Sequence, residues 1–280
     1  MVTMQDINLW YLLEPIAAVL ISTILVMYWY RKRRFGFIIL MYSLFAYAIA
    51  ITVKVVFQEL TIGYLPQNLY IQGLYYGLQT AILEVGLAYI FARYLVRKRE
   101  TKAIDGISYG LLLAFWENGI LLGVLPIINI ISAFAIIHGG TAASSTVYNS
   151  IASSNPSLLL GGIPTVSILL GILERVSSII IHLSWGILAF AAAFYGRKKY
   201  LALALPMGLV DFFVPFSKSI GIFHFEILIF LISVASLALA YFGVPFLKRR
   251  KGSQRGALPK QHHSSAYNQN AYISENRNNK

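Results

Sequence analysis

The stretch ILLGILERVSSIIIHLSWGILAFAAAFY, residues Ile168–Tyr195, decides the fold. It is long enough to cross a bilayer, because a transmembrane helix needs about 20 mainly apolar residues. Inside this apolar run lie the ionisable residues Glu174, Arg175 and His182. Such groups are costly at membrane depth and commonly mark a functional site, so we expect their partners on other spans.

The remainder of the chain has the same apolar character. Of 280 residues, 58% are hydrophobic and 12% are charged, which is typical of an all-α polytopic membrane protein. We expect residues 127–137 to extend the fourth span or to form an interfacial segment, and residues 138–156 to form a loop of small residues. The apolar runs predict about seven transmembrane helices, at roughly 12–30, 35–57, 70–96, 104–125, 168–195, 200–217 and 222–247.

The basic residues predict the orientation. Nineteen of the 23 lysines and arginines fall at 31–34, 97–102, 197–199 and beyond 247, all on one side of the predicted spans. The positive-inside rule makes that side cytoplasmic, so we expect a multi-pass protein of the cell membrane with the N-terminus outside and the C-terminus inside. Basic segments beside a span usually contact anionic lipid, so the bilayer is the expected partner and nucleic acid is not.

Two regions are expected along the chain. Residues 1–251 form the transmembrane domain, and residues 252–280, rich in Asn, Ser and Gln, form a disordered cytoplasmic tail.

Four ionisable residues are predicted to share one depth in the membrane. Glu84, Glu117, His182 and Asp211 each lie within three residues of the midpoint of a predicted span, so at about 1.5 Å per residue they fall within roughly 4 Å of one plane. Glu174 and Arg175 lie about two turns nearer the outside and are expected to support this site, as an ion pair or through a neighbouring span.

Other charged residues are expected at the interfaces. Lys54 is predicted near the end of the second span, where its long side chain can reach the membrane surface. His224 and Glu226 open the seventh span and are predicted to face water.

Several of these segments resemble the YhfC-like family of intramembrane proteases, which is distantly related to the CAAX-prenyl proteases. ERVSSIIIHLSWG at 174–186 is similar to the family's ERxxAxxxHxxxS helix. Three further stretches follow in the family's order: AILEVGLAYIFARYLVRKR at 81–99, DGISYGLLLAFWENGILLG at 105–123 and LPMGLVDFF at 205–213. The resemblance covers roughly residues 35–247. It implies a membrane-embedded glutamic-type peptidase acting on a peptide or a membrane protein.

The chain departs from the family's motifs at four positions. Leu83 stands in place of a paired glutamate and Leu87 in place of an arginine, while Leu113 and Met207 replace two histidines. Two other classes therefore stay open. One is a proton- or cation-coupled transporter or channel component, and the other is an inactive scaffold that binds membrane segments.

The surviving residues suggest a particular chemistry. The resemblance implies that Glu84 or Glu117 takes a proton from water, with His182 as its partner or as an oxyanion donor. We expect no metal and no other cofactor, because the chain has no cysteine and zinc sites usually have more nitrogen or sulfur ligands than one intramembrane histidine.

Overall fold

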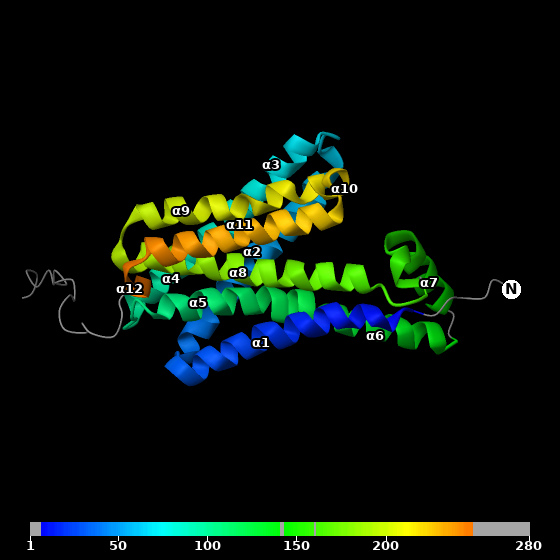
Figure 1. The fold of residues 1–280 in the computed structure, drawn as a ribbon, viewed down its shortest axis with the longest axis horizontal. Coiled ribbons are helices and arrows are strands. Elements are labelled where there is room, and N and C mark those ends of the chain that lie inside the picture. The colour runs from blue at the N-terminus through cyan, green and yellow to red at the C-terminus, as the bar shows by residue number, and fades with distance from the viewer. Residues whose placement is uncertain (1–6, 141–142, 160, 249–280) are drawn as a thin grey trace, which may run out of the picture. The chain divides into compact units, whose positions relative to one another are not determined.

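Seven helical spans make up the transmembrane part of the protein. The computed structural model describes residues 7–140, 143–159 and 161–248, and within these ranges it contains no β-strand. Seven helices in this part of the chain are long and apolar enough to cross a membrane, which confirms the predicted number. The spans are α1 (Leu13–Arg33), α2 (Phe37–Thr61), α3 with α4 (Leu69–Gln79 and Gly86–Lys98), α5 with α6 (Asp105–Ala114 and Leu125–His138), α8 (Thr165–Tyr195), α9 with α10 (Lys198–Gly208 and Ser217–Ile220) and α11 (Ile222–Gly243) (Figure 1).

The segments between the spans differ in part from the prediction. α6 continues the fourth span as far as His138, so residues 127–137 follow the first of the two predicted alternatives. The prediction of a loop at 138–156 is wrong, because Ala143–Ser154 forms the helix α7. The side chains of Val147, Tyr148 and Ile151 pack on a small apolar cluster. This packing stabilises a helix in a segment whose small residues predicted a loop.

The C-terminal end of the described chain is the short helix α12 (Pro245–Lys248). The predicted tail, residues 252–280, lies outside the described residues. The orientation of the spans, with the N-terminus outside, also stays a prediction.

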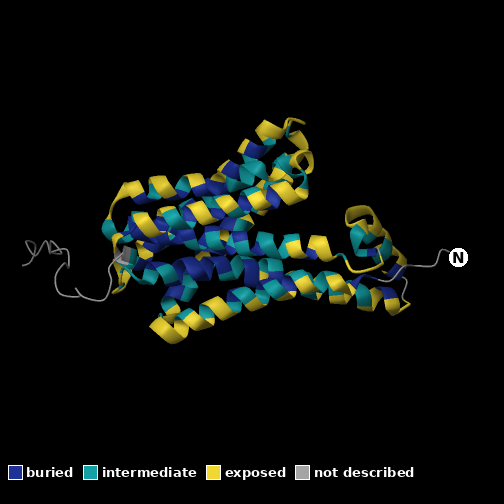
Figure 2. Cartoon of the chain, in the orientation of Figure 1, coloured by how far each residue is buried: buried dark blue, intermediate teal, exposed yellow. Residues whose placement is uncertain are grey.

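The helix α8 is the centre of the packing. It contacts α1, α4, α5, α9 and α11, and Figure 1 shows it between α11 and α5. The apolar part of α8 is 72% buried, against 39% or less in each of the other six spans. Buried residues accordingly concentrate along α5 and α8 (Figure 2). The stretch Ile168–Tyr195, which belongs to α8, therefore also forms the core of the bundle.

Small residues allow the closest helix contacts. A Cβ added to Gly186 of α8 would lie 2.5 Å from the Cα of Gly110 in α5, so only glycine fits there. A Cβ added to Gly208 of α9 would lie 2.6 Å from the Cα of Ala81. Helices in a membrane pack through such small-residue contacts. These two contacts bring the spans that carry Glu117 and Asp211 close to their neighbours.

Candidate functional site

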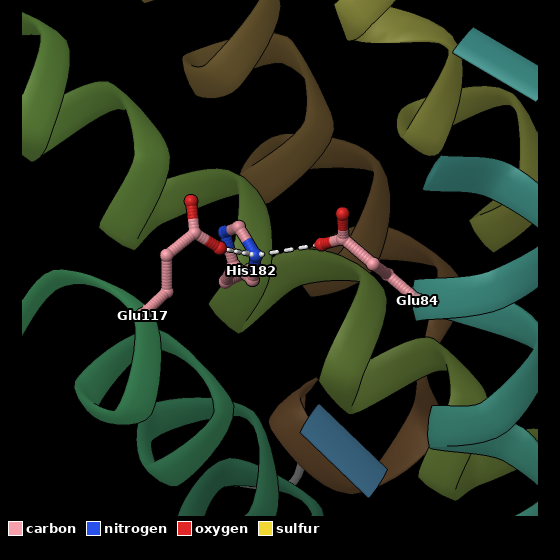
Figure 3. Close-up of side chains that lie close together, drawn as sticks. All are labelled: Glu84, Glu117 and His182. Atoms are coloured by element: carbon pink, nitrogen blue, oxygen red, sulfur yellow. Dashed lines mark ion pairs between the residues drawn. The ribbon is translucent and has the colours of Figure 1, made fainter. Parts of the chain in front are cut away.

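Three ionisable side chains from three different spans meet beside the middle of α8 (Figure 3). His182 Nε2 lies 3.4 Å from Glu84 Oε2 and is in ion-pair contact with Glu117 Oε2. One donor atom from each residue can be chosen so that the three atoms lie within 4.8 Å of one another. The structure thus brings together three of the four residues that the sequence placed at one depth, while their role stays a prediction.

Both glutamates lie on π-helical turns inside otherwise α-helical spans. Glu84 belongs to the turn Thr80–Val85, between α3 and α4, and Glu117 to the turn Phe115–Val124, between α5 and α6. A π-helical turn hydrogen-bonds over five residues instead of four, which changes the direction of the side chains that it carries. Such turns are rare and are frequently found at functional sites. Their presence at both glutamates therefore marks this region independently of the side-chain contacts.

His182 is oriented by its own helix. Its Nδ1 lies 2.9 Å from the carbonyl oxygen of Ser178, and since a carbonyl oxygen can only accept, Nδ1 carries a hydrogen and donates it. The imidazole ring also packs against Trp185, with ring centroids 4.1 Å apart. Nε2 is therefore the nitrogen that His182 presents to the two glutamates.

Lys54 belongs to the same cluster, so the prediction that it reaches the membrane surface is wrong. Its Nζ donates to Glu84 Oε1 at 2.7 Å, to Asp211 Oδ2 at 3.0 Å and to Thr80 Oγ1 at 2.7 Å. Its side chain is only 15% exposed. The prediction failed because the second span was expected to end too early: α2 continues to Thr61, which leaves Lys54 well inside the helix.

Asp211 joins the cluster through Lys54 and Thr80. Thr80 Oγ1 donates a hydrogen bond of 2.5 Å to Asp211 Oδ2, the oxygen that also accepts from Lys54. Asp211 lies in the 3₁₀-helical segment Leu209–Phe216, which interrupts the sixth span between two prolines. The prolines break the α-helical hydrogen bonding there and so favour the irregular turn that carries the carboxylate.

A second cluster of ionisable residues surrounds Arg175, seven residues before His182 on α8. Arg175 is in ion-pair contact with its neighbour Glu174, and its Nε lies 3.7 Å from Glu14 Oε1 of α1. The expected partner of Arg175 on another span is thus Glu14, which sequence analysis missed. Glu226 of α11 also lies inside the bundle, with an exposure of 2%, so the prediction that it faces water is wrong.

One cavity joins the two clusters. Its volume is about 540 Å³, and its wall includes Glu84, Glu117 and His182 as well as Arg175 and Glu226. This volume falls within the range of roughly 300–1,000 Å³ that is usual for ligand sites. An elongated ligand lying along α8 would therefore contact both clusters.

The four positions at which the chain departs from the family's motifs lie outside the lining of the cavity. Leu113 and Met207 are buried in apolar packing, with exposures of 3% and 5%. Neither of them, nor Leu83 or Leu87, lines the cavity. Among the described residues, His182 is therefore the histidine that lines this cavity.

The donor set suits a divalent cation. Glu84, Glu117 and Asp211 supply three carboxylates against the single ammonium group of Lys54, which leaves two negative charges uncompensated when His182 is neutral. Within the described ranges, the buried His182 Nε2 and Glu117 Oε2 contact each other as an ion pair and have no further hydrogen-bond partner. Carboxylate oxygens and an imidazole nitrogen are the ligands of catalytic zinc and similar ions. The expectation of a metal-free site stays a prediction, and this geometry is a specific reason to test it.

Comparison with known proteins identifies the family. No curated protein and no solved structure matches the chain. The family model described as YhfC intramembrane metalloprotease matches residues 16–232, which include all the spans that build the cavity. With most of its length matched by this model, the chain belongs to the YhfC intramembrane metalloprotease family.

Proposed function

We propose that this protein hydrolyses peptide bonds in or next to the membrane, with Glu84, Glu117 and His182 as the reacting groups. The observation that carries the proposal is the meeting of these three side chains, from three spans, on the wall of one cavity. Membership of the family supports the same reaction class. The substrate would be a membrane-protein segment or a peptide that enters the cavity in extended form.

Glu117 is the better general base of the two glutamates. Glu84 is bound by Lys54 through Oε1, so its negative charge is already compensated. Among the described residues no lysine or arginine pairs with Glu117; its Oε2 faces His182, and its Oε1 accepts only a long hydrogen bond of 3.3 Å from Ser178. Glu117 Oε1 would take a proton from the attacking water, whose oxygen bonds to the scissile carbonyl carbon. The same proton would pass to the leaving nitrogen as the carbon–nitrogen bond breaks.

The other residues would hold the reacting groups in place. Ser178 is fixed between Glu117 and the side-chain amide of Asn118, which donates to its Oγ at 3.0 Å. Lys54 holds Glu84 at the position where it meets His182. Prearranged polar groups of this kind stabilise charge in a transition state without reorganising.

A bound metal ion would fit the same residues. Glu84, Glu117 and His182 would be its ligands, and the description of the family as a metalloprotease is the reason to consider such an ion. When bound, such an ion acts as a Lewis acid towards a carbonyl oxygen and lowers the pKa of a bound water. With an ion bound, Glu117 Oε1 would still be the oxygen positioned to accept a proton, because Oε2 is the oxygen that faces His182.

Cleavage by purified protein tests the proposal. The full chain in lipid nanodiscs would be incubated with a mixed-sequence panel of quenched fluorogenic transmembrane peptides. We expect Glu117→Gln to lower the cleavage rate about a hundredfold or more, the usual effect of losing a general base. The matched control is Glu59→Gln, the same change at an exposed position of α2 that does not line the cavity.

Two results would contradict the proposal. One is cleavage by Glu117→Gln at the rate of the unmodified protein, which would exclude Glu117 as the base. The other is the absence of cleavage of every peptide by protein that is folded and monodisperse. In that case proton flux across proteoliposomes separates a cation-coupled transporter from an inactive scaffold.

A further inference from the structure

The cluster around Arg175 has an excess of negative charge. Three carboxylates, those of Glu14, Glu174 and Glu226, surround a single guanidinium group. Glu174 of α8 and Glu226 of α11 line the cavity, whereas Glu14 of α1 is not among its lining residues and contacts Arg175. Within the part of the chain that the structure describes, Arg175 makes ion-pair contact with Glu174 and Glu14, and no ion pair compensates the charge of Glu226.

Glu226 is the member of the cluster that lacks a direct partner. It is 2% exposed, and its Oε2 has no hydrogen-bond partner among the described residues. Burying a charged group without a partner is costly, and native proteins usually pair such groups. Because Glu226 lines the cavity, a ligand in the cavity can supply the missing donor. The ligand must donate, since a carboxylate only accepts hydrogen bonds, and the excess of negative charge in the cluster favours a cationic donor.

The distance between the two clusters relates this ligand to the proposed reaction. Arg175 and His182 are seven residues apart on α8, which corresponds to about 10 Å along one face of the helix. An extended peptide advances about 3.3–3.6 Å per residue. A peptide bond at His182 and a group beside Arg175 would therefore be about three residues apart in an extended chain.

We propose that Glu226, together with Glu174, forms a subsite for a cationic group of the substrate, about three residues from the bond that is cut. The group is an ammonium or a guanidinium, and it belongs either to a lysine or arginine side chain or to the amino terminus of the peptide. The position of the subsite relative to the cleaved bond rests on the proposed function. Its ability to bind a cation does not depend on cleavage.

Binding of matched peptides to the intact protein tests the subsite. The probes are fluorescent transmembrane peptides that carry either lysine or norleucine at one position, each with a free or an acetylated amino terminus. Their dissociation constants would be measured by fluorescence anisotropy with the full chain in nanodiscs. We expect the lysine or free-amine peptide to bind about tenfold more tightly than its neutral counterpart, since losing a buried charge pair costs at least this much.

The variants assign that preference to the cluster. Glu226→Gln keeps the shape of the side chain and is expected to abolish the preference for the cationic peptide. Glu174→Gln is expected to reduce this preference less, because the Glu174 side chain is 44% exposed. This second variant keeps the test valid if Glu226→Gln does not fold. Glu59→Gln is the control and is expected to leave the preference intact.

The two proposals fail in distinguishable ways. Equal binding of the cationic and neutral peptides to the unmodified protein would overturn the subsite, whether or not the peptides are cleaved. A preference that persists in both Glu226→Gln and Glu174→Gln would overturn it as well. Tighter binding of the cationic peptide without any cleavage would support the subsite and contradict the proposed peptidase. If acetylation removes the preference, the cation is the amino terminus and not a side chain.

Discussion

Replacing Lys54 by methionine would remove the positive charge that two carboxylates share inside the bundle. At an effective dielectric constant of about 20, the gross attraction is about 6 kcal/mol for Glu84 at 2.7 Å and about 5.5 kcal/mol for Asp211 at 3.0 Å. Most of this is offset by the free energy of removing the charges from water. Breaking a buried ion pair from one side nevertheless destabilises a protein by about 3–5 kcal/mol, because the remaining charge is left unpaired.

We therefore expect Lys54→Met to lower the free energy of unfolding by about 3 kcal/mol, at the lower end of that range because the Asp211 side chain is 30% exposed. The assay is reversible unfolding in mixed detergent, followed by circular dichroism. Lys218→Met is the matched control, since Lys218 is exposed on α10, and we expect it to change stability by less than about 1 kcal/mol.

A double-mutant cycle tests the reasoning directly. If the loss comes from an unpaired charge on Glu84, the double variant Lys54→Met with Glu84→Gln should be less destabilised than the sum of its two single variants. Additive losses would refute the charge-pairing explanation. They would mean that Lys54 stabilises the bundle through the packing of its aliphatic stem.

Two further predictions concern packing and metal. Gly186→Val is expected to lower the free energy of unfolding by about 2 kcal/mol or more, because an added Cβ would meet the backbone of Gly110, whereas Gly63→Ala, with open space around it, should be nearly neutral. Equal effects of the two changes would contradict this account of the contact between α5 and α8. Elemental analysis of the purified protein is expected to find about one divalent ion per chain, lost in His182→Ala and retained in His224→Ala, which changes an exposed histidine. No ion above background in the unmodified protein would support the metal-free chemistry that the sequence predicted.

The errors of prediction have a common physical cause. Lys54 and Glu226 were both assigned to a membrane surface from their distance to a span end. In the structure α2 runs on past the predicted end, and Glu226 shares the buried face of α11 with Ile229, Ser233 and Ser236. The spacing of these three residues from Glu226 is a helical stripe, a signal in the sequence that could have found it.

The two π-helical turns could not be predicted from the sequence. Hydropathy and helical periodicity describe Thr80–Val85 and Phe115–Val124 as ordinary parts of apolar helices. Whether a turn is α- or π-helical depends on how its neighbours pack, and here the neighbours include the close contact of Gly208 with Ala81.

The sequence by itself determined the class of the protein, the number of its spans and the ionisable residues that interrupt its apolar runs. It could do so because transfer into lipid depends on the composition of each segment alone, and a charge within an apolar run is visible without a partner. Only the tertiary structure decided that Glu84, Glu117 and His182 meet, that Lys54 compensates Glu84, and that Glu226 faces the cavity. These facts depend on the rotation of each helix about its axis and on the distance between axes, which side-chain packing between spans sets.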